Sequence, residues 1–319
     1  MVGRTLSIWS NQESVELQYS SASMIFKLNT KFMFGHNFAK SLEKISEKLT
    51  KSKPSAFSFP LNIPGTEYHN FVKKKLKDSF RNMIKERRNS TGTSDGPGDL
   101  LDHAIADTQI EQFLTEELVV NLMFAVFYAS FDTISTGITL IVDFISAHPS
   151  VLDESLAEHG AILERREDAR HTLNWDEYRS MKFTHQVINE ALRLGNIAFG
   201  LLRRVLKDIQ MNGFTIPAGW VILLVHSAPH FDADTYEDPL IFNPWHWKEL
   251  DSSEISKTFR PFGGGTRQCA GAEYAKAVLA VFMHVLVTKY RWTKVRGQVV
   301  YNPMVGFGEG VHIKVSDRT

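Results

Sequence analysis

Hydrophobic residues recur three and four positions apart along much of the first part of the chain, which is the spacing of an α-helix with one buried face. This pattern predicts helices over residues 14–34, 38–51 and 68–88. The last of these is rich in lysine and arginine, which we expect on a solvated face. Residues 56–65 are apolar but interrupted by prolines, and residues 89–98 are rich in serine, threonine and glycine, so both predict loops.

A long hydrophobic run over residues 115–148 predicts a further helix, which Pro149 ends. Its length and composition would also suit a membrane span. Asp132 and Asp143 favour a helix that crosses the core of a soluble domain, because an aspartate in the middle of a membrane span costs about 3 kcal/mol to insert.

The second half of the chain mixes helical and alternating patterns. Residues 176–193 predict another helix, residues 200–224 predict strands around an Asn212-Gly213 hairpin turn, and residues 303–315 predict a final hairpin. The sequence therefore predicts a mainly α protein of the α+β class with small β-sheets.

The composition limits the class of protein. Lysine plus arginine and aspartate plus glutamate both number 36 in 319 residues, so nothing indicates a nucleic-acid partner. With 43% hydrophobic residues, the chain can bury one large core or two modest ones. One cysteine is typical of a reducing compartment, and the first twenty-five residues contain neither a signal-peptide core nor a membrane anchor.

The single cysteine lies in a glycine-rich loop over residues 262–271, which runs into a predicted helix. The start of a helix favours the thiolate form of Cys269, and the three glycines let the backbone lie close to a flat object. Arg267 adds a forked cation that suits a carboxylate. Together these features favour a loop that binds haem iron through a thiolate.

Other interpretations of this loop stay open at the level of the residues. A lone cysteine is often an inert buried side chain. A glycine-rich loop before a helix also suits phosphate. However, Ala272-Glu273 stands where a phosphate loop has lysine and a hydroxyl residue, and Gln268 stands where a dinucleotide loop has its third glycine. A thiol-dependent or nucleotide-binding enzyme is therefore the weakest alternative.

The loop resembles the haem-binding signature of the cytochrome P-450 monooxygenases. Five positions match it: Phe262, Gly265, Arg267, Cys269 and Gly271. The wider stretch looks like the plant clan that oxidises steroids and triterpenoids. The resemblance implies the cytochrome P-450 fold, of which this chain, as a single domain over residues 1–319, would be the C-terminal two-thirds. The N-terminal membrane anchor and first helices of plant members are expected to be missing.

The long helix carries a second motif of the same family. Ala129, Asp132 and Thr133 resemble its oxygen-activating segment, in which Thr133 would steady bound oxygen while Asp132 relays protons. Ala125, Tyr128 and Ala129 share one helical face and would meet the substrate.

Ser130 departs from this motif, because the family commonly has glycine there. We expect its hydroxymethyl group to narrow or rewire the oxygen groove. On the residues alone, Asp132 and Thr133 also suit an ordinary polar kink, since a threonine hydroxyl often bonds back one turn.

Glu190 and Arg193 resemble the Glu-x-x-Arg motif that anchors the family's fold beneath the haem. A surface ion pair of small energy is the simpler interpretation. His246 replaces the arginine that completes this network in the family. Because neutral histidine offers one donor where arginine offers five, we expect part of the Glu190 carboxylate to stay unpaired.

Further roles rest on the resemblance alone. Arg203 would meet a haem propionate. Substrate contacts are expected from Ile197, Phe199, Val305 and Phe307. His226 and His230 are expected to be structural, because Pro229 between them argues against a helical metal pair.

The resemblance implies a monooxygenase that hydroxylates a hydrophobic, sterol- or triterpenoid-like substrate with O₂. Haem b, with Cys269 as its axial ligand, would be the cofactor. NADPH would act through an NADPH–cytochrome P-450 reductase that docks near Lys257, Arg260 and Lys276. The expected location is the cytosolic face of the endoplasmic reticulum membrane, with surface contact through the 56–65 loop. The alternative is a non-catalytic truncated remnant that does not retain haem.

Overall fold

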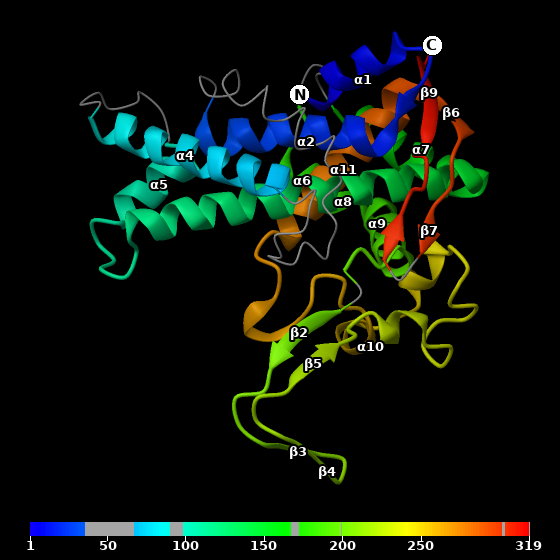
Figure 1. Cartoon of the computed structure of the whole chain (residues 1–319). Coiled ribbons are helices and arrows are strands. Elements are labelled where there is room, and N and C mark those ends of the chain that lie inside the picture. Colours follow the sequence, from blue (N-terminus) through cyan, green and yellow to red (C-terminus); the bar gives the residue numbers. More distant parts are fainter. Residues whose placement is uncertain (36–66, 90–97, 167–171, 199, 302–303, 319) are drawn as a thin grey trace. The chain divides into compact units, whose positions relative to one another are not determined.

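The computed structural model describes residues 1–35, 67–89, 98–166, 172–198, 200–301 and 304–318 (Figure 1). The chain divides into two compact units, of which unit 1 contains Met1 and residues 17–135 and unit 2 contains residues 2–16 and 136–319. The single domain predicted over the whole chain stays a prediction. Three predicted segments fall wholly or largely outside the described residues: 38–51, 56–65 and 89–98.

Unit 1 is helical in its described part. Its helices are α2 (Leu17–Phe34), α4 (Glu67–Asn89), α5 (Leu100–Asp107) and the first part of α6 (Glu116–Ala147). Their apolar faces share one core. Phe26 of α2 packs edge-on against Phe127 of α6 with ring centroids 4.7 Å apart, and Phe34 lies 4.8 Å from Phe80 of α4. The predicted helices that became α2 and α4 are confirmed.

The short helix α5 was not predicted. Asp99 starts it by accepting hydrogen bonds from the backbone N–H groups of Leu101 and Asp102. Arg87 of α4 binds the same Asp99 side chain through two guanidinium nitrogens, at 2.5 and 2.7 Å. The cap and the arginine together attach α5 to α4.

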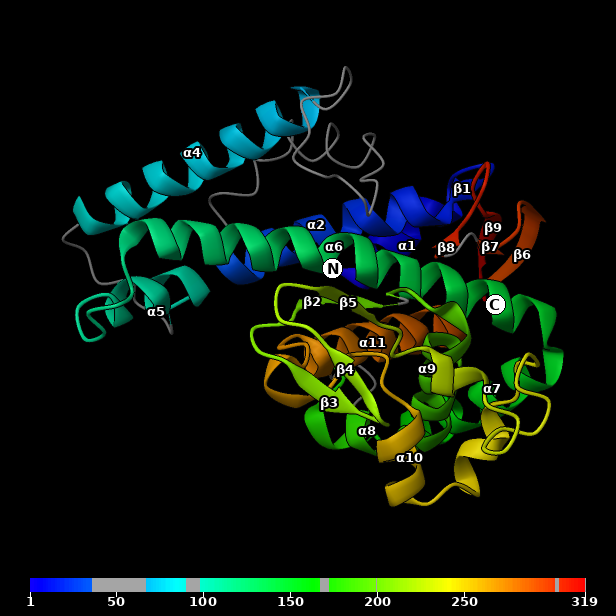
Figure 2. The ribbon, with the colours of Figure 1, turned by 60° about the horizontal axis from the view of Figure 1, so that its bottom comes forward.

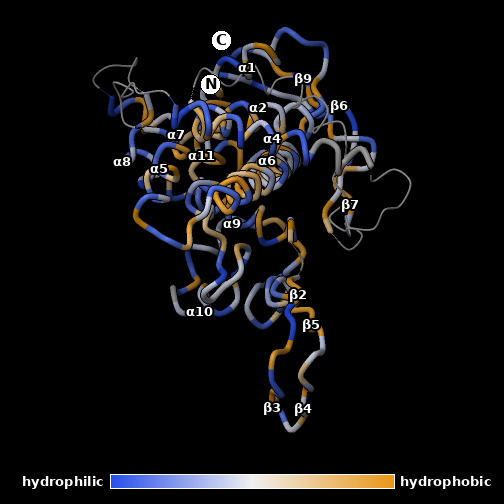
Figure 3. The backbone as a smooth tube through the Cα atoms, turned by 60° about the vertical axis from the view of Figure 1, so that its left-hand side comes forward, coloured by the Kyte–Doolittle hydropathy of each residue, from blue (hydrophilic) through white to orange (hydrophobic). Residues whose placement is uncertain are grey.

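Helix α6 is continuous over the segment in which the hydrophobic pattern predicted a helix. Its trace in Figure 3 is largely coloured as hydrophobic. Within the described residues it is the one helix whose length and hydropathy would allow it to cross a membrane, and 39% of its most apolar window is buried inside the structure. Pro149 not only follows this helix but begins the next one, at a position where its missing N–H costs nothing.

Unit 2 combines helices with small sheets. Its complete α-helices are α1 (Val2–Ser10), α7 (Pro149–Glu164), α8 (Trp175–Ser180), α9 (Lys182–Gly195), α10 (Ser252–Thr258) and α11 (Ala272–Lys289). Helices α7, α9 and α11 contact one another, and the end of α6 belongs to the same unit. Helix α9 carries Glu190 and Arg193, and the glycine-rich loop with Cys269 leads into α11.

The sheets of unit 2 are antiparallel. The three-stranded sheet has the order β1 (Val15–Glu16), β9 (His312–Asp317), β6 (Tyr290–Arg296). The pairs are β2 (Leu201–Arg204) with β5 (Val221–Leu224), β3 (Ile209–Met211) with β4 (Phe214–Ile216), and β7 (Val300–Tyr301) with β8 (Val305–Gly306). Asn212 and Gly213 form the predicted turn between β3 and β4, with φ of 51° and 79°. Figure 2 shows this hairpin next to β2 and β5.

Two predicted elements were wrong in detail. The helix expected over residues 176–193 is split at Met181, which ends α8 and begins α9. The carboxylate of Glu158 on α7 accepts the backbone N–H groups of Phe183 and Thr184 at 2.6 and 2.9 Å, so α9 begins where this carboxylate caps it. The final hairpin over residues 303–315 does not form either, because β8 pairs with β7 while β9 pairs with β6 and β1.

Candidate functional site

The glycine-rich loop that precedes α11 in unit 2 is closed by its own backbone. Cys269 N–H donates to the carbonyl of Phe262 at 3.0 Å, and Gln268 N–H donates to that of Gly265 at 3.1 Å. Seven consecutive residues, 264–270, are nevertheless exposed. The loop therefore has a fixed conformation while its outer side, including the thiol of Cys269, stays accessible.

Two glycines of this loop adopt a conformation that other residues avoid. Gly263 and Gly265 both have φ of +71°. A Cβ on Gly265 would have no atom within 4 Å, so its neighbourhood is open, and a Cβ on Gly271 would lie 3.9 Å from the sulfur of Cys269. The absence of side chains at these positions keeps the surface beside the sulfur flat.

Two arginines of unit 2 have no carboxylate partner among the described residues. Arg203 on β2 is half-buried and donates to the carbonyl of Leu202 at 2.9 Å, while Arg267 in the loop is exposed and has no hydrogen bond or ion pair within the described part of the chain. Strand β2 lies against the loop, because Leu201 Cδ1 is 3.7 Å from where a Cβ of Gly263 would stand. Both arginines are therefore available for an anionic ligand.

These residues fit the haem that the resemblance implies. An accessible thiol suits iron, a bare glycine surface suits the flat face of a porphyrin, and unpaired guanidinium groups suit its carboxylates. An inert buried cysteine, which was the simpler interpretation, does not describe the exposed Cys269.

In unit 1, α6 presents one continuous open face. The residues of this face are exposed and follow one another at intervals of three or four positions along the helix: Leu118, Leu122, Ala125, Val126, Ala129 and Thr133. Tyr128, which was expected on this face, is half-buried and stacks on Phe124 with ring centroids 5.6 Å apart. The open face is thus mainly apolar, and Thr133 provides its hydroxyl group.

Asp132 and Thr133 differ in their surroundings. The Thr133 hydroxyl donates to the carbonyl of Ala129 at 2.8 Å, the back-bond that an ordinary polar kink would also show. Burial raises the pKa of Asp132. Burial, and then the charge of Asp132, raise the pKa of Tyr128 to about 12. A carboxyl group with a raised pKa exchanges protons closer to neutral pH, which suits a relay.

The hydroxyl of Ser130 has partners on α6 and on α2. Its hydroxyl donates to the carbonyl of Val126 at 2.7 Å and accepts a hydrogen bond from Nδ2 of Asn29 on α2 at 2.8 Å. The side chain therefore faces α2, about 100° around the helix from Ala129. That Ser130 narrows or rewires the oxygen groove stays a prediction.

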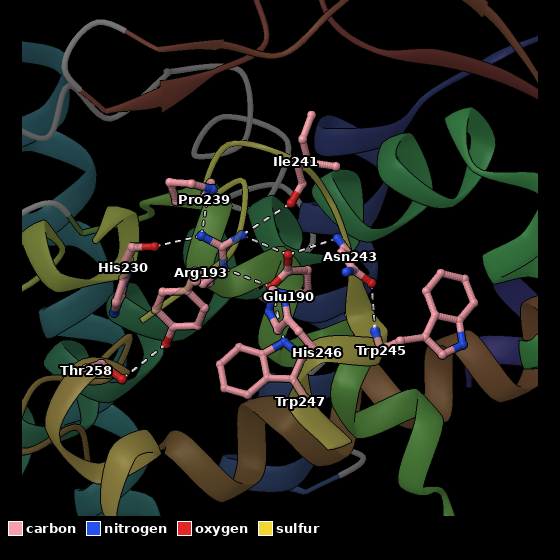
Figure 4. Close-up of polar contacts among 11 residues, drawn as sticks. Glu190, Arg193, His230, Pro239, Ile241, Asn243, Trp245, His246, Trp247 and Thr258 are labelled. Atoms are coloured by element: carbon pink, nitrogen blue, oxygen red, sulfur yellow. Dashed lines mark hydrogen bonds and ion pairs between the residues drawn. The ribbon is translucent and has the colours of Figure 1, made fainter. Parts of the chain in front are cut away.

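Glu190 and Arg193 of α9 form a buried ion pair rather than a surface one, since both side chains are 0% exposed (Figure 4). Arg193 donates from Nε and Nη2 to the two carboxylate oxygens of Glu190 at 2.9 and 2.8 Å. Its Nη1 also donates to the carbonyls of His230 and Pro239, both at 2.6 Å. The arginine thus joins α9 to the segment that follows β5.

Three further donors complete the environment of Glu190. His246 Nε2 and Trp247 Nε1 lie 3.0 and 3.1 Å from Oε2, and the backbone N–H of Asn243 lies 3.0 Å from Oε1 (Figure 4). Burial by itself would raise the pKa of Glu190, but hydrogen bonds from Arg193 and His246, the charge of Arg193 and the Asn243 N–H outweigh it, so the pKa is lowered. The expectation of a partly unpaired carboxylate was wrong.

Trp247 and Asn243 are the members of this network that sequence reasoning missed. Asn243 caps a short 3-10 helix, Pro244–Lys248, by accepting from the N–H of Trp245 at 3.1 Å. An asparagine followed by proline is a signal for such a turn. That signal would have placed His246 and Trp247 on one helical turn after the cap.

The remaining predicted positions have varied surroundings. Ile197 and Val305 are half-buried, Phe307 is buried with 5% of its surface exposed, and Phe199 lies outside the described residues. His230 is also buried, and its Nε2 accepts from the backbone N–H of Arg260 at 3.0 Å. Within the described residues no group of three or more side chains that could hold a metal ion occurs. The structural role of this histidine stays a prediction.

Comparisons with known proteins agree on one family. The family model described as cytochrome P450, which is the family that the cysteine loop resembles, matches residues 14–313. A cucurbitadienol 11-hydroxylase from Siraitia grosvenorii is 44% identical over 98% of this chain and 66% of its own length. A beta-amyrin 16-alpha-hydroxylase from Maesa lanceolata is 43% identical over 95% of this chain and 64% of its own length. The chain thus spans about two thirds of these curated relatives.

The fold is similar to that of a solved structure, a cyanobacterial CYP120A1 with bound retinoic acid. The TM-score is 0.86, with 22% sequence identity, and the match covers 99% of this chain and 73% of the other. The predicted fold class, mainly α with small β-sheets, is therefore confirmed.

Proposed function

Because this chain belongs to the cytochrome P-450 family, we propose that it is the catalytic part of a haem-thiolate monooxygenase that hydroxylates a triterpenoid- or sterol-like substrate. The observation that carries the proposal is the exposed glycine loop with the chain's single cysteine at the start of α11. The names of the two relatives, which act on cucurbitadienol and beta-amyrin, support a triterpenoid substrate.

The family implies haem iron as the cofactor, and the loop residues suit its parts. The Cys269 thiolate would be the axial ligand, while Arg203 and Arg267 would bind its carboxylates. Gly265 and Gly271 would leave room for its flat face. When bound, haem supplies the iron centre at which O₂ is activated for insertion into a C–H bond.

The open face of α6 would contact the substrate, and Asp132 and Thr133 would take part in proton transfer. Ala125 and Ala129 offer an apolar surface without bulky side chains. The rings of Phe124 and Tyr128 stack on each other beside this surface. Thr133 would offer the hydroxyl that now donates to the Ala129 carbonyl, and Asp132 would hold and release the protons.

Electrons would come from a flavoprotein reductase, as is general for this family. Arg260 is exposed, and its Nη1 lies 3.0 Å from where a Cβ of Gly264 would stand. Lys276 lies 5.7 Å from the Phe262 ring centroid and 3.6 Å from Glu273, and Lys257 is exposed on α10. Arg260 and Lys276 therefore supply positive charge beside the cysteine loop. We propose that the whole protein lies on the cytosolic face of the endoplasmic reticulum membrane.

The alternative, a remnant that does not retain haem, was motivated in part by Ser130 and His246. Both side chains have a hydrogen-bond partner, at Asn29 and at Glu190, although Nδ1 of His246 is buried without one among the described residues. The Glu190 carboxylate, which His246 contacts, nevertheless has its donors. The monooxygenase proposal is therefore the better supported of the two.

The proposal is tested by the reduced carbon-monoxide difference spectrum of the expressed chain, with and without the N-terminal third of the Siraitia relative joined to it. We expect the spectrum of a thiolate-ligated haem, and we expect Cys269→Ala to abolish it. Thr266→Ala, an exposed neighbour in the same loop, is the matched control and should keep the spectrum. A wild-type chain that binds no haem in either form would overturn the proposal.

Thr133→Val should uncouple the reaction in the haem-loaded protein. Valine keeps the shape of threonine but removes the hydroxyl, so product formed per NADPH should fall by about tenfold while NADPH consumption continues. Thr133→Ser, which keeps a hydroxyl, should recover most of the coupling. Equal product per NADPH in Thr133→Val and the wild type would contradict the role of Thr133.

A further inference from the structure

The hydrogen bond between Asn29 and Ser130 connects α2 to the functional segment of α6. Asn29 is 2% exposed and its Nδ2 lies 2.8 Å from the Ser130 hydroxyl oxygen. Serine carries one hydroxyl hydrogen, which goes to the Val126 carbonyl at 2.7 Å, so the oxygen accepts from Asn29. A single side chain is thereby fixed from two directions, by its own helix and by the neighbouring one.

Aromatic contacts also join these two helices, and they are less directional. Phe26, one turn before Asn29, packs against Phe127 and Phe131 with ring centroids 4.7 and 6.4 Å apart. Aromatic contacts of this kind tolerate small rotations and shifts of a helix, whereas a hydrogen bond weakens steeply when its angle changes. The Asn29–Ser130 bond therefore restrains the rotation of α6 against α2 more sharply than these ring contacts do.

The rotation of α6 decides which residues its open face presents. Ala129 directly precedes Ser130, and Thr133 follows it by three positions, so a rotation of the helix moves all three together. In the structure Ala129 and Thr133 are exposed while Ser130 faces α2. A glycine at position 130 would supply no such restraint.

We propose that Asn29 and Ser130 are a positioning pair, specific to the serine at position 130, that holds α6 in the rotation in which Ala129 and Thr133 form the open face. Its consequence for catalysis rests on the proposed function. The Thr133 hydroxyl is bonded to the Ala129 carbonyl, so engaging oxygen requires its side chain to turn while the backbone stays in place. The bond between Asn29 and Ser130 would hold the backbone of α6 in place while the Thr133 side chain turns.

The first test is amide hydrogen exchange on the 319-residue chain, which requires no bound cofactor. In Ser130→Ala, exchange in the segment 126–133 should become about fivefold faster, the equivalent of about 1 kcal/mol at 25 °C. Ser130→Thr keeps the hydroxyl and should restore the wild-type rate. Thr30→Val is the matched control, because Thr30 is as buried as Asn29 but its hydroxyl bonds within α2, to Phe26 O at 2.8 Å.

The second test is product formed per NADPH in the haem-loaded protein. Ser130→Ala and Asn29→Leu should each lower this ratio about threefold, Ser130→Thr should restore it, and Thr30→Val should leave it unchanged. A defect of folding alone would reduce the amount of active enzyme without changing the ratio.

The outcomes separate this proposal from the proposed function. Exchange in Ser130→Ala that equals exchange in Thr30→Val would overturn the positioning pair, as would faster exchange with an unchanged ratio. A wild-type chain without a thiolate-type carbon-monoxide spectrum would contradict the proposed function, and the exchange experiment would still decide whether the pair fixes α6.

Discussion

Lowering the pH from 7 to 5 is expected to reduce the free energy of unfolding by about 2 kcal/mol for each of two buried histidines of unit 2, His159 and His284. Burial, and then the charge of His284, lower the pKa of His159 to about 3. Burial, and then the charge of Arg166, lower the pKa of His284 to about 4, and Glu177 offsets only part of this. Neither imidazole is protonated in the folded chain near pH 5.

The hydrogen bonds around the pair fix which nitrogens carry hydrogen. The Glu158 carboxylate accepts the Thr184 hydroxyl at 2.6 Å, so Thr184 accepts in turn from His159 Nε2 at 3.1 Å. The free lone pair of His159 is then on Nδ1, which accepts from Nδ1 of His284 at 3.1 Å. This chain of hydrogen bonds joins α11, α7 and α9 and needs His159 neutral, because a proton on its Nδ1 would face the Nδ1–H donor of His284.

The sign of the pH dependence follows from these pKa values. The ordinary histidine pKa is 6.5, so the unfolded chain binds these protons at a higher pH than the folded chain does. The contribution of the two neutral histidines to the free energy of unfolding is fully present above about pH 6.5. It is lost as the pH falls toward 4 and then 3, by about 1.4 kcal/mol per pH unit for each histidine.

The measurement is urea unfolding between pH 4.5 and 8. In the double variant His159→Leu, His284→Leu, the number of protons taken up on unfolding near pH 5 should fall by about two, so the pH profile becomes flatter. Thr184→Val is the matched control, because it breaks the same chain without removing a titrating group and should lower stability equally at each pH. A double variant with the wild-type slope would rule out the pair as the origin of the acid sensitivity.

The sequence predicted those parts of the fold that depend on neighbouring residues. The helices α2, α4 and α6 follow from apolar spacing, and the β3–β4 turn follows from Asn212-Gly213. The sequence did not predict the break at Met181, because the carboxylate that caps α9 comes from Glu158, on another helix. The place of the last strand was missed for the same reason, because β9 pairs with β1, near the start of the chain, and with β6.

The candidate site shows the same division. The loop around Cys269 could be located from its residues, since its glycines and its cysteine are consecutive in the chain. The orientation of Ser130 could not be predicted, because its direction depends on Asn29, 101 positions earlier. The donors to Glu190 from Trp247 and Asn243 were missed because more than fifty residues separate them from the carboxylate.

Truncation of Glu190 to alanine is expected to lower the free energy of unfolding by about 3–5 kcal/mol, because it leaves the Arg193 guanidinium buried without a counter-charge. Glu190→Gln should be nearly as harmful. Each carboxylate oxygen accepts at least two hydrogen bonds, so the amide NH₂ would face donors wherever it lies.

Trp247→Phe is the matched control for this network. It removes one donor to Glu190 and keeps an aromatic ring that packs on Phe259, where the ring centroids are 4.6 Å apart. We expect it to cost about 1 kcal/mol. All variants are compared by urea unfolding of the 319-residue chain at pH 7.5. Equal losses in Glu190→Ala and Trp247→Phe would show that the carboxylate is not the centre of the network.

His246→Arg tests the correction that the structure makes to the sequence-based expectation. A histidine that left Glu190 underpaired would make the arginine variant more stable, but Glu190 already accepts five hydrogen bonds. The imidazole also lies between the rings of Tyr236 and Trp247, with centroids 5.4 and 5.5 Å away. A longer side chain would have to displace these rings, so we expect His246→Arg to lower stability by about 1–3 kcal/mol. A gain in stability would mean that the carboxylate needs a further donor after all.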